Sequence, residues 1–307
     1  MGDYSIQELT SILAMQGFAG LSLFSVLLLM ALGLAIIFGQ MGVINMAHGE
    51  FMAIGAYTTY MLSVMTETYF PEFLSYYFFF AIIASFIVAG VVGYFIEWLL
   101  IRHLYKRPLD TLLATWGLSL IMQQIFRSLF GAREVSPTLP DWLMGSYMPT
   151  DTIFIPINGM FVLGLTTLVT IGVFILMYRS SWGLNVRATT QNRVMSGAVG
   201  INTTRVDRMT FALGCGIAGV AGAAFTTIAS TGPTPGSLYI VDTFMVVVFG
   251  GAASLFGTIA SAFSIAQAQS ILEFFISGSM AKVLTLLTLV IILMMRPEGL
   301  FSSKVRK

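Results

Sequence analysis

The stretch FGQMGVINMAHGEFMAIGA, Phe38–Ala56, interrupts an apolar run with glycines and with three polar side chains. These are Asn45, His48 and Glu50, which fall within six positions. The surrounding residues Ile12–Met65 contain no lysine or arginine, and two membrane crossings need about 40 residues. The stretch therefore occupies the short connection between two crossings, without the basic residues that anchor a loop at lipid headgroups.

Two interpretations of this interruption follow from its composition. A carboxylate at the centre of a bilayer costs about 2.5–3.5 kcal/mol, so Glu50 is expected to face the helix bundle or a cavity. Irregular backbone at that depth is stable where protein or a water-filled cavity surrounds it, as in the discontinuous helices of many transporters. The alternative is a short cytoplasmic turn whose polar residues meet water.

The whole chain has the composition of an integral membrane protein. Of its 307 residues, 57% are apolar and only 9% are charged, whereas about a quarter of a soluble domain is charged. The apolar stretches have the length of membrane helices and lack the alternation of barrel strands. We therefore predict one all-α domain, residues 1–307, a polytopic bundle with eight or nine transmembrane crossings, some of them broken or re-entrant. The predicted spans are Gly20–Gly39, Met46–Met65, Tyr76–Ile101, Leu112–Phe130, Gly159–Tyr178, Met209–Ser230, Phe244–Ile276 and Val283–Met295.

The basic residues predict the orientation of the chain. Twelve of the fifteen lysines and arginines gather in three segments, which the positive-inside rule places in the cytoplasm. Acidic or mixed segments alternate with them, including a proline-rich outer loop at about 131–158. The N-terminus is then expected outside and the C-terminus inside, which requires an odd number of crossings. The basic residues are Arg102, Lys106 and Arg107; Arg179, Arg187, Arg193, Arg205 and Arg208; and Arg296, Lys304, Arg306 and Lys307.

A second apolar segment, Phe244–Phe275, is also interrupted by glycines, and its Phe249–Gly250 matches Phe38–Gly39. Two such segments, one in each half of the chain, are expected of internal repeats around a site at the membrane midplane. Close packing of helices through small residues is the competing explanation.

The longest basic connection, about residues 180–208, contains a predicted amphipathic helix. Leu184, Ala188, Met195 and Val199 recur near helical spacing, and Gly200 supplies a C-terminal stop. Such a helix docks into a groove of a partner, lies on lipid or is simply solvated. The pattern alone leaves these three interpretations open.

The sequence holds no arrangement expected of an enzyme. It lacks the GxxxxGK[ST] loop that cradles nucleotide phosphates, and its histidines are His48 and His103 alone. The single cysteine, Cys215, lies in a glycine- and alanine-rich span and is expected to be a small packing residue. We predict no catalytic residue, metal site or cofactor, so any ATP hydrolysis must take place on another subunit.

Four stretches of the chain resemble a known family. LGLAIIFGQMGVINMAHGEFMAIGAYTTY is similar to the signature of the membrane subunits of branched-chain-amino-acid-type ABC importers. Three others resemble the urea-specific branch of that family: RPLDTLLATWGLSLIMQQIFRSLFGA, RATTQNRVMSGAVGINTTRVDRMTFALGCGIAGVAGA and YIVDTFMVVVFGGAASLFGT. The resemblance extends from about Leu32 to Pro297. The chain departs from it at Ala252, where a glycine is common, and we expect this to affect local packing only.

The resemblance implies that the chain is the first of two permease subunits in a urea importer of a bacterial plasma membrane. A second permease, two cytoplasmic ATP-binding subunits and an extracytoplasmic solute-binding protein would complete the importer, with no part for nucleic acid. The segment around Gln191–Gly200 is similar to the coupling helix of the family, which docks into the ATPase. The residues expected to couple this chain to the ATPase are Arg187, Gln191, Asn192, Met195 and Gly200.

Urea is a small neutral diamide, which needs hydrogen-bond donors and acceptors and offers no charge. Polar residues within the spans are therefore candidates for the substrate pathway. Asp242 and Glu273 are expected to be structural instead, Glu273 as the partner of Lys282. A permease for branched-chain amino acids or short-chain amides is one alternative, and a stand-alone urea channel is another. The pathway candidates are Asn45, His48, Glu50, Tyr57, Thr58, Thr115, Gln123 and Gln267.

Overall fold

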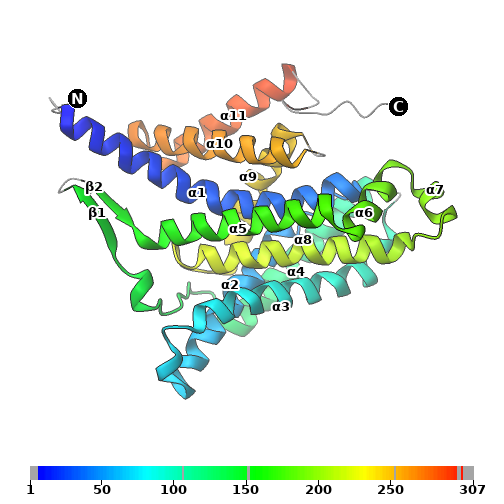
Figure 1. The fold of residues 1–307 in the computed structure, drawn as a ribbon, viewed down its shortest axis with the longest axis horizontal. Coiled ribbons are helices and arrows are strands. Elements are labelled where there is room, and N and C mark those ends of the chain that lie inside the picture. The colour runs from blue at the N-terminus through cyan, green and yellow to red at the C-terminus, as the bar shows by residue number, and fades with distance from the viewer. Residues whose placement is uncertain (1–5, 106, 151–152, 252–253, 296–298, 300–307) are drawn as a thin grey trace.

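The computed structural model describes residues 6–105, 107–150, 153–251, 254–295 and 299. Within these residues the chain forms eleven α-helices and one two-stranded hairpin (Figure 1). The predicted polytopic all-α fold is confirmed. Lys106, Ala252, Arg296, Lys304, Arg306 and Lys307, named above, lie outside the described residues. The elements are α1 (Ile6–Met41), α2 (His48–Tyr69), α3 (Tyr77–Leu99), α4 (Pro108–Phe130), β1 (Ser146–Thr150), β2 (Ile153–Pro156), α5 (Ile157–Arg179), α6 (Ser181–Gln191), α7 (Arg193–Ala198), α8 (Thr203–Phe225), α9 (Pro235–Gly250), α10 (Leu255–Phe275) and α11 (Gly278–Met295).

Six described helices are long and apolar enough to cross a membrane: α1, α3, α5, α8, α10 and α11. α2 and α4 have the length, with 22 and 23 residues, but they carry more polar side chains. α9 is a shorter apolar helix of 16 residues. The predicted span Phe244–Ile276 is divided, because α9 ends at Gly250 and α10 begins at Leu255.

The start of α2 lies inside the bundle and not at the end of α1. His48 Nε2 lies 3.2 Å from the carbonyl oxygen of Met30, and Met30 precedes Met41, the last residue of α1, by about three turns, roughly 16 Å. Residues 42–47 therefore run back along α1 before α2 begins. The polar interruption is a discontinuous helix within the bundle, and the alternative of a turn in water is wrong, since Asn45, His48 and Glu50 are at most 2% exposed.

α8 is the central helix, and small residues bring its neighbours close. A Cβ on Gly219 would overlap α3 at the carbonyl of Ser85, and one on Gly222 would overlap α2 at the carbonyl of Met52. In the same way Gly55 of α2 lies against the backbone of Gly219. Glycine allows such backbone-to-backbone contacts between membrane helices, where no water drives association.

Two reciprocal glycine contacts relate the two halves of the chain. α1 and α8 meet at Gly33 and Gly214, and α2 and α9 meet at Gly49 and Gly236; in both pairs each glycine faces the carbonyl oxygen of the other. If α1, α2 and α3 correspond to α8, α9 and α10, the other contacts correspond as well. The pair α3–α8 matches α10–α1, and the pair α2–α3 matches α9–α10. The structure therefore has the predicted internal repeat, which consists of α1–α4 and α8–α11. The close packing of small residues, offered as the alternative explanation, is also present and lies at the centre of the repeat.

The repeat is inverted. Thr190 of α6 bonds to Gln40 at the end of α1, and α8 begins at this same end of the bundle, which we call the α6 end (right in Figure 1). The opposite end carries β1 and β2 and is called the hairpin end. α2 runs from the middle to the hairpin end, and α9 from the middle to the α6 end. Among the described helices six are long and apolar enough to cross a membrane, so the predicted number of eight or nine crossings stays a prediction.

The connection at about 131–158, predicted as a proline-rich loop, contains the antiparallel hairpin β1–β2. Strands of four and five residues that contain proline give no alternation by which to predict them. Val135 and Thr231 exchange backbone hydrogen bonds of 2.8 Å. The connection is therefore tied to the segment that leads from α8 into α9.

Candidate functional site

The interruption between α1 and α2 is held by hydrogen bonds of its own residues and of α4. Gly42 has a φ of +65°, which favours glycine, and its N–H donates to Phe38 at 2.9 Å as α1 ends. Asn45 accepts the N–H of Ala47 on its side-chain oxygen at 3.1 Å. The hydroxyl of Thr115 accepts the N–H of Met46 at 3.1 Å. Asn45 and Thr115, both predicted as pathway residues, thus fix the backbone that precedes α2.

His48 begins α2 and is fully buried. Since the Met30 carbonyl can only accept, His48 Nε2 must carry the proton of their 3.2 Å hydrogen bond. The ring packs where a Cβ on Gly33 would lie 3.1 Å from it, so glycine at that position makes room for the imidazole. The other ring nitrogen, Nδ1, has no hydrogen-bond partner.

Glu50 lies in the first turn of α2, where the helix dipole favours an acidic side chain, and its exposed fraction is 0%. Its Oε1 accepts hydrogen bonds from Ser119 Oγ and Gln123 Nε2, both at 2.9 Å. Its Oε2 has no partner. The sequence named Glu50 and Gln123 but missed Ser119; residues 115, 119 and 123 are spaced four apart, which places three polar side chains on one face of α4.

The polar contacts between α2 and α4 continue into an aromatic cluster. The ring of Tyr57 stacks on Phe130 with centroids 4.1 Å apart and also contacts Phe126 at 5.2 Å. The Tyr57 hydroxyl is buried without a hydrogen-bond partner. Thr58 bonds back to the carbonyl of Ile54 in its own helix at 2.7 Å and does not join the cluster.

Unpaired buried polar atoms concentrate in this part of the chain. Among the described residues, seven buried side-chain nitrogen or oxygen atoms lack a hydrogen-bond partner. Four of the seven belong to the stretch from Asn45 to Tyr57, and they are Asn45 Nδ2, His48 Nδ1, Glu50 Oε2 and Tyr57 OH. Since buried polar atoms are rarely left unpaired, this stretch, with Ser119 and Gln123, is the candidate site; we call it the Glu50 cluster.

Gln267 of α10 donates to the carbonyl of Gly17 in α1 at 3.2 Å and so joins two helices. Its place in the substrate pathway stays a prediction, whereas one ion pair predicted for the second half of the chain is wrong. Lys282 of α11 pairs with Asp242 of α9 at 2.7 Å and not with Glu273, which accepts from Gln269. The expected Glu273–Lys282 pair is therefore wrong.

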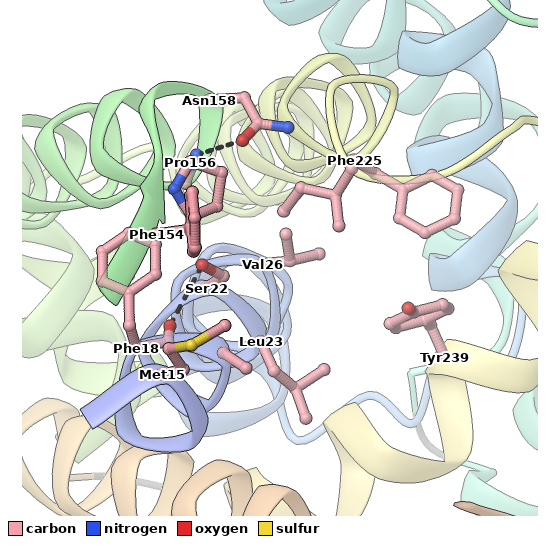
Figure 2. A pocket seen from close by; sticks show the side chains of 13 residues that line it. Met15, Phe18, Ser22, Leu23, Val26, Phe154, Pro156, Asn158, Phe225 and Tyr239 are labelled. Atoms are coloured by element: carbon pink, nitrogen blue, oxygen red, sulfur yellow. Dashed lines mark hydrogen bonds between the residues drawn. The ribbon is translucent and has the colours of Figure 1, made fainter. Parts of the chain in front are cut away.

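A cavity of about 410 Å³ lies at the hairpin end between α1, α5, α8 and α9. Figure 2 shows the rings of Phe154 and Tyr239 on opposite sides of it, with side chains of α1 between them. Its lining is mostly apolar, and Ser22, Asn158 and Tyr239 supply the polar groups. None of the pathway residues predicted from the sequence lines this cavity. Val26, also in the lining, precedes Met30 by one helical turn, so the cavity ends about 6 Å along α1 from the depth at which α2 begins.

The basic connection forms two helices where the sequence predicted one helix from Leu184 to Val199. Asn192 is the reason for the division, because it leaves the helical conformation and caps α7 by accepting the N–H of Met195 at 3.0 Å. The predicted stop is confirmed, since α7 ends at Ala198 and Gly200 has a φ of +91°.

The side chains predicted to couple this segment to a partner differ in exposure. Arg187 is directed back onto the last turn of α5, where it donates to the carbonyl of Met177 and lies over the ring of Tyr178. Gln191 and Asn192 are exposed. Met195 is also exposed, as are its neighbour Val194 and Val199, the residue after α7. α7 therefore presents apolar side chains at the α6 end.

The possible metal ligands of the described residues are dispersed, and the cysteine is a packing residue. No group of three or more His, Cys, Asp or Glu side chains there could hold a metal ion. Cys215 is fully buried and packs against Gly93 of α3; a Cβ atom added to Gly93 would lie only 2.6 Å from the Cβ of Cys215. Its predicted role as a small packing residue agrees with this position.

Comparisons with known proteins match nearly the whole chain. Residues 17–293 match the family described as "Branched-chain amino acid transport system / permease component". The chain is 26% identical over 296 residues to the high-affinity branched-chain amino acid transport system permease protein LivH of Salmonella typhimurium, covering 93% of this chain and 94% of that protein. It is 26% identical over 290 residues to the permease protein BraD of Pseudomonas aeruginosa, covering 92% and 93%. The probable permease LivH of Methanocaldococcus jannaschii is 22% identical over 293 residues, covering 90% and 88%. No solved structure matches the chain.

Proposed function

Because the chain belongs to the family of permease components of branched-chain amino acid transport systems, we propose that it is the first permease subunit of an ATP-driven importer of urea. A second permease, two ATP-hydrolysing subunits and an extracytoplasmic binding protein complete this assembly in a bacterial plasma membrane. The α6 end faces the cytoplasm, and the hairpin end faces the binding protein. The N-terminus is then outside, and the C-terminus is inside.

Support for the partner ATPase comes from the α6–α7 segment. The sequence contains no P-loop, so the energy of ATP must reach this chain from another subunit. α7 exposes 82% of Val194 and 59% of Met195, and Val199, which directly follows the helix, is 73% exposed. Such apolar side chains on a short helix suit a groove in a partner protein. Arg187, Gln191, Asn192 and Gly200 shape this segment and are proposed to couple it to the ATPase.

The observation that carries the substrate proposal is the set of unpaired atoms in the Glu50 cluster. Urea offers four N–H donors and one carbonyl acceptor. Glu50 Oε2 and His48 Nδ1 can accept hydrogen bonds, Asn45 Nδ2 can donate one, and Tyr57 OH can do both. The cluster contains no lysine or arginine to pair with the carboxylate of an amino acid. A small neutral diamide therefore complements it better than a zwitterion does.

The path proposed for the substrate begins in the cavity of Figure 2 and continues past the start of α2. Asn45, His48, Glu50, Tyr57, Thr115 and Gln123 are the residues proposed to line or shape it; Ser119 joins them through Glu50. Thr58 and Gln267 are left out, because both bond to backbone elsewhere.

Branched-chain amino acids are the second candidate substrate. The relatives LivH and BraD carry these substrates in their names, and the lining of the cavity, with Leu23, Val26 and Phe225, suits an aliphatic side chain. The 22–26% identity to these relatives leaves room for a different substrate within the family.

A reconstituted importer tests the proposal. We expect the five-part assembly in proteoliposomes to take up labelled urea in an ATP-dependent manner, with leucine a poor competitor. If the importer instead takes up leucine and urea does not inhibit this uptake, branched-chain amino acids replace urea as the proposed substrate. The chain reconstituted alone is the control for a stand-alone channel, and urea flux through it without ATP would contradict the importer.

A further inference from the structure

Two acidic side chains are buried at the α6 end, and each is paired with an arginine. Glu97, in the last turn of α3, has a side chain that is 0% exposed and accepts from Arg208 Nε at 3.0 Å. Asp207 of α8 is 4% exposed and pairs with Arg193, the first residue of α7. Buried acids of this kind need a counter-charge, because an unpaired buried charge is strongly unfavourable.

Tyr105 joins these two ion pairs into one network. It lies in the connection between α3 and α4, and its hydroxyl donates to Glu97 Oε1 at 2.5 Å. The guanidinium of Arg193 lies over its ring, 5.2 Å from the centroid. Burial, and then the hydrogen bond to Glu97, raise the pKa of Tyr105 above its ordinary value, so the hydroxyl remains a proton donor. We call this set the Arg193 network; it consists of Arg193, Asp207, Tyr105, Glu97 and Arg208.

The Arg193 network is the ionic connection between α7 and the membrane helices. In the part of the chain that the structure describes, Arg193 is the only α7 side chain with an ion pair. Its partner Asp207 lies on α8, and Tyr105 leads to Glu97 on α3. A displacement of the start of α7 therefore acts directly on α8, while the exposed side chains of α7 remain available to a partner.

α8 in turn contacts the helix that carries the Glu50 cluster. Gly219 and Gly222 of α8 lie against the backbone of α2 at Gly55 and Met52. These contacts have no side chain to absorb a shift, so a movement of α8 along its axis is passed to α2. Arg193 and the Glu50 cluster are thus connected through one continuous helix.

We propose that Arg193 is a positioning residue that transmits displacement of α7 to α8 and so to the Glu50 cluster. The inference rests on the proposed function, in which an ATPase binds at α7. Arg193 touches neither nucleotide nor substrate. It acts through Asp207 and through the ring of Tyr105, and its loss separates ATP hydrolysis from transport without preventing assembly.

The test uses the whole importer in proteoliposomes, with Arg193→Gln, Arg193→Lys, Asp207→Asn and the double variant Arg193→Gln/Asp207→Asn. We expect Arg193→Gln to retain the ATPase subunits on purification and to hydrolyse ATP at the basal rate. Stimulation of ATPase activity by urea-loaded binding protein should fall about fivefold or more, at the lower limit typical of coupling between sites. Arg193→Lys should keep part of the stimulation, since it preserves the charge.

A matched control and the double variant separate transmission from general damage. Arg205→Gln changes another arginine near the start of α8, one without an ion pair in the described residues, and should leave stimulation unchanged. The double variant should be no worse than Arg193→Gln alone, because both changes remove one interaction. Multiplied losses, normal stimulation in Arg193→Gln, or loss of the ATPase subunits from that variant would each overturn the proposal. A wild-type importer that binding protein does not stimulate would instead overturn the proposed function, and the transmission role with it.

Discussion

α2 and α9 are equivalent helices of the two halves, and they use the same backbone device for different chemistry. Both begin inside the bundle, where Gly49 and Gly236 face each other, and they run to opposite ends. Each carries a buried acid. Glu50 of α2 accepts from a hydroxyl and an amide and keeps one oxygen unpaired, whereas Asp242 of α9 is paired with Lys282 at 2.7 Å.

The difference distinguishes a stabilising contact, at Asp242, from the proposed substrate site at Glu50. The carboxylate of Asp242 is neutralised by an ammonium group, so the contact is complete without a ligand. Glu50 has only neutral partners, and its free oxygen lies in a stretch that contains four of the seven unpaired buried atoms of the described chain. Changes in the α9–α11 pair should therefore affect stability, and changes around Glu50 should affect transport.

The largest effect is expected at the contact that the two helices share. Valine in place of Gly49 or of Gly236 would overlap the opposite backbone, which no change of rotamer can relieve. We expect both single variants to fail to accumulate as folded protein, since overpacking costs about 1–3 kcal/mol even where side chains can move. The measurement is the yield of monodisperse protein in detergent.

Gly172→Val is the control for this pair of variants. Gly172 lies on the exposed face of α5, and a methyl group added there would have nothing within 4 Å of it, so the variant should be recovered at wild-type yield. A marked difference between Gly49→Val and Gly236→Val would show that the two helices do not contribute equally to their contact.

Glu50→Gln should abolish most transport while the protein stays folded. The amide oxygen of glutamine can still accept from Ser119 and Gln123, but an N–H group replaces the free acceptor Oε2. One lost hydrogen bond to substrate is worth about 1–3 kcal/mol, so we expect urea uptake to fall about tenfold or more. Uptake by the reconstituted importer is the measurement, and wild-type uptake in this variant would exclude the Glu50 cluster from the pathway.

Lys282→Met should have the opposite effect, a loss of stability with transport retained. Removing one partner of a buried ion pair costs about 3–5 kcal/mol, and because Lys282 is 34% exposed we expect a smaller loss of about 2 kcal/mol. Thermal unfolding in detergent measures it. Adding Asp242→Asn should restore part of the stability, since no charge is then left unpaired. Uptake per folded molecule should remain near wild type; a loss as large as that of Glu50→Gln would end the distinction between the two acids.

The smallest effect is expected for Gln267→Met. The change removes the hydrogen bond from Gln267 to the carbonyl of Gly17, which is worth about 1 kcal/mol, and it leaves the Glu50 cluster untouched. We expect a slightly lower unfolding temperature and unchanged urea uptake. A loss of uptake beyond the loss of folded protein would return Gln267 to the pathway.

Much of the fold could be predicted because each span carries its own signal. Apolar length marked the membrane helices, and the glycines and polar residues between Phe38 and Ala56 marked the discontinuity before α2. Gly200 marked the end of α7, since the left-handed conformation there favours glycine. These features are local in the sequence, so a single sequence reveals them.

The rest depends on contacts between distant segments. The depth at which α2 begins is set by the hydrogen bond between His48 and Met30 and by the contacts of Gly49 with Gly236 and of Gly55 with Gly219. None of these contacts has a local signal in the sequence. The sequence predicted that Lys282 pairs with Glu273, but the fold places the carboxylate of Asp242 on α9 at 2.7 Å from its ammonium group. Ser119 was missed although its spacing from Thr115 and Gln123 was visible, because its importance appears only once Glu50 lies opposite.

The contact of Gly49 with Gly236 also has a consequence for conformational entropy. Most helix interfaces immobilise rotamers when they close, at a cost of up to about 2 kcal/mol for a long side chain. Here two residues without side chains meet, so their contact can separate and form again without freezing any χ angle. Such a helix contact can open and close in every transport cycle at little cost in side-chain entropy. The position of the contact is set by the two helix backbones alone.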